Sequence, residues 1–199
     1  MIYSNKRKDL ISLLNRLFGN NGLRGKDKWN DRDLEGCSWQ WLQLFVLQLI
    51  DDYPGTKLIY DYAPKALLAD HDFILKSVQI NGLALKIASQ DLQNNPDIVL
   101  EAVKGDGCAL EYASQNLQNN PDIVLAAVKK YGGALRYTSP YLQNNREVVL
   151  EAVKQHGWAL EFTSEELKGN PEVVLAAMTQ NGRALQFASE ELKGNPEVV

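Results

Sequence analysis

Apolar side chains recur along most of the chain with two regular spacings, one within short segments and one between them. The motif Asn-Pro-Asp-Ile-Val-Leu-Glu-Ala-Val begins at Asn95, and close variants begin at Asn120, Asn145 and Asn170. Within each copy the apolar residues fall three and four positions apart, which is the spacing of one face of a helix. Between copies the period is 25 residues. A fixed period of this kind predicts short helical units that stack and share a continuous core.

Each unit contains signals for more than one helix. Asn95, Pro96 and Asp97 supply a side-chain cap, a first-turn proline and a first-turn acid, so we expect a helix over 96–105. The glycine at 107 is interpreted as a helix stop that needs a positive φ. A second, shorter helix and one more tight turn, capped by a recurrent serine, complete the unit. No alternating apolar pattern occurs, so the expected fold is all-α, a solenoid-like array. The units are 70–94, 95–119, 120–144, 145–169 and 170–194, with a sixth beginning at 195–199.

Two further anchors make the repeat specific. Gly-x-Ala-Leu stands in the middle of every unit, and an aromatic residue, a small residue and Ser-x-x-Leu follow it, as in Asn181-Gly-Arg-Ala-Leu-Gln-Phe-Ala-Ser-Glu-Glu-Leu-Lys193. Together with Val-Leu-x-Ala-Val, these residues resemble the tandem repeats named domain of unknown function 4116 over residues 70–199. The resemblance implies an α-helical array, often in multi-repeat proteins of intracellular bacteria and protists. It implies no activity, so no functional residues are carried over.

The first third of the chain is different. Residues 1–44 are expected to form an N-terminal helical region with a mobile loop near 20–36, and residues 45–69 a degenerate repeat that caps the array, with Tyr62 and Leu67 at the repeat's anchor positions. Because the sixth unit stops after Val199, we expect the parent protein to continue with further repeats.

Charge and cysteine content narrow the possible partners and locations. The net charge is −4, but residues 1–28 hold seven basic and two acidic residues (+5), and residues 70–199 hold 11 basic and 17 acidic residues (−6). An acidic array repels phosphate, which argues against nucleic acid as the partner. Cys37 and Cys108 lack metal-like spacing and predict reduced thiols in a cytoplasmic protein. The longest apolar stretch, 39–50, is too short to span a membrane, and no signal peptide is recognisable.

No arrangement of residues predicts catalysis. His71 and His156 belong to units separated by two whole repeats, and a serine that recurs in every unit is a cap rather than a nucleophile. We find no phosphate-binding loop, dinucleotide motif or zinc-ligand spacing. The sequence therefore predicts a protein that is not an enzyme, with no catalytic residue, cofactor or metal.

The positions that differ between units lie around the central glycine. They read Asn81 with Leu83, Asp106 with Cys108, Tyr131 with Gly133, His156 with Trp158, and Asn181 with Arg183, together with Lys86, Glu111, Arg136, Glu161 and Gln186. Stacking in register would align them as a ridge. The variation between units has two explanations. One is drift at turn positions that nothing constrains, and the other is a binding surface whose residues differ from unit to unit. An exposed tryptophan is a frequent interface anchor, so the candidate contact residues are Tyr131, His156, Trp158, Arg183 and Arg136.

The favoured function is a protein-interaction scaffold that forms part of a longer protein and binds an unidentified protein partner. The resembling family occurs in intracellular bacteria and protists, which suggests a role as a bacterial effector that acts inside a host cell. Two alternatives remain: a nucleic-acid reader that uses one unit per base, and a substrate-docking module of an enzyme whose catalytic domain lies outside this chain.

Overall fold

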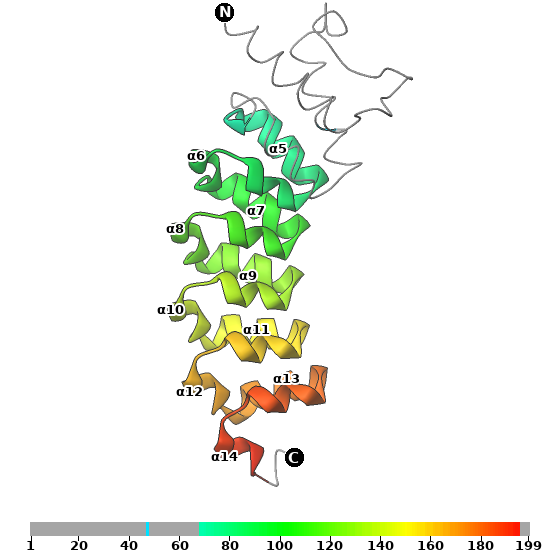
Figure 1. Ribbon diagram of the computed structural model, residues 1–199, viewed down its shortest axis with the longest axis vertical. Coiled ribbons are helices and arrows are strands. Elements are labelled where there is room, and N and C mark those ends of the chain that lie inside the picture. The colour runs from blue at the N-terminus through cyan, green and yellow to red at the C-terminus, as the bar shows by residue number, and fades with distance from the viewer. Residues whose placement is uncertain (1–46, 48–67, 196–199) are drawn as a thin grey trace, which may run out of the picture.

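The computed structural model describes residue 47 and residues 68–195, and these form a stack of short helices with no strand (Figure 1). The main elements are α-helices of ten residues each, which lie side by side along the long axis. They are α5 (His71–Ile80), α7 (Pro96–Gly105), α9 (Pro121–Lys130), α11 (Arg146–Gln155) and α13 (Pro171–Gln180). The all-α repeat array is confirmed, and α7 spans the range that the sequence predicted.

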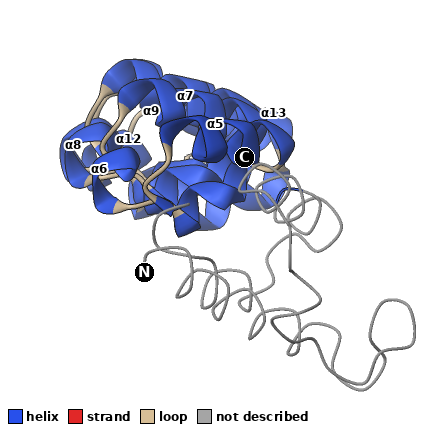
Figure 2. Ribbon diagram, turned by 90° about the horizontal axis from the view of Figure 1, so that it is seen from above, coloured by secondary structure: helices blue, strands red, loops and turns tan. Residues whose placement is uncertain are grey.

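The second half of each unit consists of two shorter pieces. The expected second helix is a 3₁₀-helix of six residues: η3 (Gly82–Ile87), η4 (Gly107–Tyr112), η5 (Gly132–Tyr137), η6 (Gly157–Phe162) and η7 (Gly182–Phe187). The capped turn is an α-helix of four residues: α6 (Gln90–Gln93), α8 (Gln115–Gln118), α10 (Pro140–Gln143), α12 (Glu165–Lys168) and α14 (Glu190–Lys193). Figure 2, which looks along the array, shows the short helices gathered on one side of it.

Local caps start each long helix where the sequence predicted. In α7 the side-chain oxygen of Asn95 accepts hydrogen bonds from the backbone N–H of Asp97 at 3.0 Å and of Ile98 at 3.2 Å. Asn120 and Asn145 make the same pair of bonds in their units. A ten-residue helix is marginal in water without tertiary contacts, so these caps select the start of the helix rather than sustain it.

The core runs without interruption through the described units. In α7 the side chains of Ile98, Val99, Ala102 and Val103 are all buried, and the equivalent positions of α9 and α11 repeat the pattern. Each unit covers the apolar face of the next, so burial between units supplies most of the stabilisation.

The central glycine has a different purpose from the predicted one. None of the described glycines has a positive φ, so no left-handed turn ends the long helices. Instead a Cβ at Gly107 would lie 2.5 Å from the carbonyl oxygen of Ala127, in the next unit, and Gly157 stands in the same relation to Ala177. The glycine is needed because the backbones of neighbouring units approach too closely for any side chain.

Hydrogen bonds also join successive units along the short helices. The hydroxyl of Ser114 donates to the side-chain oxygen of Asn94 at 2.6 Å, and its backbone N–H donates to the carbonyl of Gln93 at 3.0 Å. The Ser139 hydroxyl donates to Asn119 at 2.5 Å, and Ser164 makes the equivalent bond to Asn144. The recurrent serine is therefore a link between units as well as a cap.

Several sequence predictions lie outside the described residues. They concern the N-terminal helical region at 1–44 with its loop near 20–36, most of the degenerate unit at 45–69, and the sixth helix that begins after Asn195. They stay predictions.

Candidate interaction surface

The variable positions around the central glycine form one row, here called the turn ridge. The residue just before the glycine is usually a cap of the 3₁₀-helix that follows. Residues 81, 106, 131, 156 and 181 each end a long helix and begin a 3₁₀-helix. The side-chain oxygens of Asn81, Asp106 and Asn181 accept from the backbone N–H two residues ahead at 3.0, 2.9 and 3.0 Å. Three of these five positions thus stabilise their own turn.

Tyr131 and His156 break that pattern in adjacent units. Neither side chain makes the capping bond. Their rings contact each other instead, with centroids 5.6 Å apart and planes tilted by 40°. The Tyr131 ring also lies over Gly133, where a Cβ would come 2.5 Å from the ring. Losing a side-chain cap costs about 1 kcal/mol, so the two units give up local stability at this point.

The imidazole of His156 is incompletely satisfied. Its Nδ1 is buried and has no hydrogen-bond partner among the described residues. An unpaired buried polar atom is unfavourable and uncommon in native proteins. His156 therefore has neither the capping bond of its position nor a hydrogen-bond partner for Nδ1 among the described residues.

Trp158 is both exposed and packed. The side chain is 37% exposed, and its ring meets the edge of Phe187 in the next unit with centroids 5.5 Å apart. Together with Gly182, Arg183 and Leu185, it lines an open hollow of about 500 Å³. The contact with Phe187, which the sequence did not predict, holds the indole in place while leaving about a third of it accessible.

Arg136 lies apart from this hollow. Its guanidinium carbon stands 4.4 Å from the centroid of the Tyr137 ring, and the guanidinium donates to the Tyr137 hydroxyl. The structure therefore groups the predicted contact residues in pairs: Tyr131 with His156, Trp158 with Arg183, and Arg136 with its own neighbour.

Cys108 sits on the same ridge, with chemistry that disfavours a nucleophile. Burial raises the pKa of its thiol, and the nearby Asp106 carboxylate raises it further, while Arg136 acts in the opposite direction. A nucleophilic cysteine needs a lowered pKa. This thiol therefore stays protonated at neutral pH.

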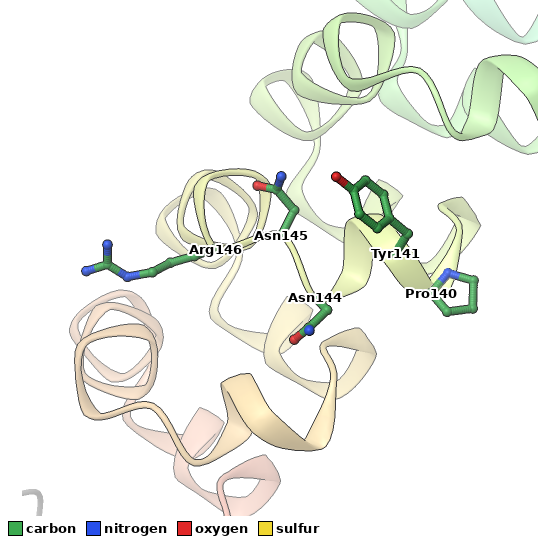
Figure 3. A pocket seen from close by; sticks show the side chains of 5 residues that line it. All are labelled: Pro140, Tyr141, Asn144, Asn145 and Arg146. Atoms are coloured by element: carbon green, nitrogen blue, oxygen red, sulfur yellow. The ribbon is translucent and has the colours of Figure 1, made fainter.

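A second group of departures from the repeat, which was not predicted from the sequence, lies at the opposite end of the long helices. Pro140 and Tyr141 stand where the other units have polar or acidic residues, and Arg146 replaces the first-turn proline. Tyr141 is 71% exposed, and an open hollow of about 540 Å³ lies among Pro140, Tyr141, Asn144, Asn145 and Arg146 (Figure 3). Three departures within seven residues were visible in the aligned units.

Within residues 68–195 no helix is long and apolar enough to cross a membrane. The same residues contain no group of three or more His, Cys, Asp and Glu side chains that could hold a metal ion.

Comparison with known proteins agrees with the repeat architecture. No curated protein and no solved structure matched the chain. The family described as "Domain of unknown function (DUF4116)" matched in overlapping segments, at residues 44–93, 95–143, 120–168 and 145–193. Each matched segment is about as long as two of the 25-residue units, and together the segments cover well over half of the sequence. The chain therefore belongs to the DUF4116 family of tandem helical repeats.

Proposed function

We propose that this protein is a non-catalytic helical scaffold that binds another protein through the turn ridge, with Tyr131, His156 and Trp158 as the central contacts. The observation that carries the proposal is the replacement of capping side chains by paired rings in two adjacent units. Giving up stability at a surface position is characteristic of residues kept for binding.

The chemistry of the ridge supports a protein partner. Aromatic and arginine side chains are enriched at the centre of protein interfaces, and the ridge offers Tyr131, Trp158 and Arg183. The Phe187 contact limits the freedom of Trp158, so less conformational entropy is lost when a partner covers the indole. Unconstrained drift gives no reason for rings of neighbouring units to meet.

The charge pattern supports protein over nucleic acid. Exposed residues on successive 3₁₀-helices alternate in sign, as Lys86, Glu111, Arg136 and Glu161. A nucleic-acid surface needs a continuous basic stripe. A salt-sensitive gel shift with RNA or DNA would favour the nucleic-acid reading instead. Docking of a substrate for an enzyme domain elsewhere in a longer protein would use the same ridge.

We also propose an intracellular location, either in the producing cell or, for a secreted effector, in a host cell. The uncrosslinked Cys108 and the family resemblance support this proposal.

The test is site-specific crosslinking. A photoreactive phenylalanine analogue placed at position 158 should capture a defined partner from the native cell, and the same analogue at the exposed position 175 on α13 should not capture it. Trp158→Ala should then weaken binding of the purified partner about tenfold or more, as expected for an interface anchor. Leu175→Ala, which shortens an exposed apolar side chain outside the turn ridge, is the control.

Far-ultraviolet circular dichroism of both variants separates binding from folding. Loss of helicity in Trp158→Ala would make the residue part of the core. Equal capture from positions 158 and 175 would contradict a role for the turn ridge.

A further inference from the structure

A second surface lies where the short helices precede the long ones, and we call it the asparagine edge. It consists of Asn94, Asn119 and Asn144 together with Tyr141, on α6, α8 and α10 and the residues that follow them. The turn ridge lies at the other end of the long helices. A helix of ten residues is about 15 Å long, so the two surfaces are separate.

The asparagine amides are held in one orientation by the next unit. Each side-chain oxygen accepts from a serine hydroxyl: Ser114 to Asn94, Ser139 to Asn119, and Ser164 to Asn144. Because the oxygen is occupied, the amide NH₂ is the group left to serve a ligand. Asn144 already donates from this nitrogen to the exposed Glu166 carboxylate at 3.1 Å. The amide is thus able to donate to an acceptor supplied from outside its own unit.

The amides repeat at the spacing of the helices. Packed helices lie about 8–10 Å apart. A polyproline II segment rises about 3.1 Å per residue with three residues per turn, so its pattern repeats about every 9 Å. A peptide lying along the stack therefore presents one carbonyl and one side chain to each unit.

Tyr141 provides an apolar contact beside Asn144, the last of the three amides. The ring is 71% exposed and borders the hollow of about 540 Å³ shown in Figure 3. The neighbouring Arg146 does not make the surface basic, because its guanidinium pairs with the Glu172 carboxylate. An exposed aromatic ring of this kind accepts a proline ring, or a cation over its face.

The charge of the edge selects a cationic ligand. Arg146 is the only basic residue in α6, α8, α10 and the first turns of α7, α9 and α11. The same elements expose four carboxylates, which are Asp91, Asp97, Asp122 and Glu147. A bound peptide with regularly spaced lysine or arginine side chains would lie close to these carboxylates along its whole length.

We propose that the asparagine edge binds an extended peptide segment of another protein, in the polyproline II conformation and with a basic residue at every third position. The amides bind its carbonyl groups, the carboxylates its basic side chains, and Tyr141 its proline or cationic groups. This proposal is independent of the turn ridge.

The experiment uses the full chain and synthetic peptides, with binding followed by fluorescence anisotropy. The probe is four Pro-Pro-Lys triplets, which put all lysines on one side of the helix. The composition control groups the same four lysines at one end. The probe should bind more tightly than the control, and Tyr141→Ala should weaken it about fivefold. Trp158→Ala should leave the affinity unchanged.

Three results would overturn the proposal. Equal affinity for the two peptides would show attraction by charge alone. Unchanged affinity in Tyr141→Ala would remove the ring from the site, and equal weakening by Trp158→Ala would move the binding to the turn ridge. Because Tyr141 is exposed, its removal leaves the core intact, and circular dichroism verifies this.

Discussion

The ring of Tyr131 lies 5.6 Å from the ring of His156, centroid to centroid, and one full repeat separates the two residues along the chain. In three other units the position that these residues occupy carries a capping Asn or Asp. This exchange of a cap for an aromatic contact leads to the first prediction.

His156→Asn should stabilise the protein. Asparagine would cap η6 as Asn181 caps η7, and the substitution would remove the unpaired buried Nδ1. We expect the free energy of unfolding to rise by about 1 kcal/mol, measured by urea denaturation. Partner binding should weaken in the same variant. The reverse change, Asn181→His, should lower stability by a similar amount, and no change in either variant would contradict the capping argument.

Gly107→Ala and Gly182→Ala should differ sharply. At Gly107 the added Cβ would meet the Ala127 carbonyl at 2.5 Å, whereas nothing described lies within 4 Å of a Cβ at Gly182. The first variant should lose about 2–3 kcal/mol through forced separation of two units. The second should be neutral or gain about 0.5 kcal/mol, because its unfolded chain is less flexible. Thermal unfolding compares them directly, and similar losses in both would mean that the glycine acts locally.

Gly169→Asn should extend the row of serine–asparagine links by one unit. Gly169 lies one period after Asn144 and takes the equivalent position in the following unit. A Cβ at Gly169 would lie 3.7 Å from the Ser189 hydroxyl oxygen. Its φ of −93° suits any residue, so no strain opposes the change. We expect a gain of about 1 kcal/mol in unfolding free energy.

Gly169→Ala provides the control, since alanine restricts the unfolded chain without making the new bond. If alanine and asparagine stabilise the protein equally, the hydrogen bond to Ser189 contributes nothing measurable.

The reactivity of Cys108 should depend on its two charged neighbours. Because burial and Asp106 raise the pKa of the thiol, its thiolate fraction at pH 8 is below that of an ordinary cysteine. In a Cys37→Ser background, alkylation by iodoacetamide should be slow and should accelerate at higher pH than for a free thiol. Asp106→Asn should shift the pH–rate profile to lower pH, and Arg136→Ala to higher pH.

Unfolding in urea gives the reference for this measurement. It removes the burial of the thiol and its charged neighbours, and it should restore the reactivity of an ordinary cysteine. A folded profile that matches the unfolded one would contradict the assigned burial.

Local signals were enough to predict the helices. Asn95 and Pro96 fix the start of α7, and the spacing of the apolar residues fixes its buried face. The reason for the glycine at 107 could not be read locally, because it depends on how closely Ala127 approaches from the next unit. A sequence shows that a side chain is absent, but it does not show whether a turn or a neighbour forbids that side chain.

In the candidate sites, too, the features set by the repeat could be predicted from the sequence, and those set by packing between units could not. The contact of Tyr131 with His156 follows from register, since residues one period apart are neighbours in a stack. The contact of Trp158 with Phe187 spans 29 positions and depends on how η6 and η7 pack, so its partial burial could not be predicted. Tyr141 was predictable as a departure from the repeat, whereas its exposure and its neighbouring hollow were not.

The close approach of glycine to carbonyl has a consequence for how such arrays change in length. Gly107 meets Ala127, and Gly157 meets Ala177, through main-chain atoms that are the same in every unit. Any unit can therefore follow any other without a matched pair of side chains at this contact. In-frame duplication or deletion of 25 codons leaves the junction unchanged, so the number of units can vary while each unit's surface residues diversify on their own.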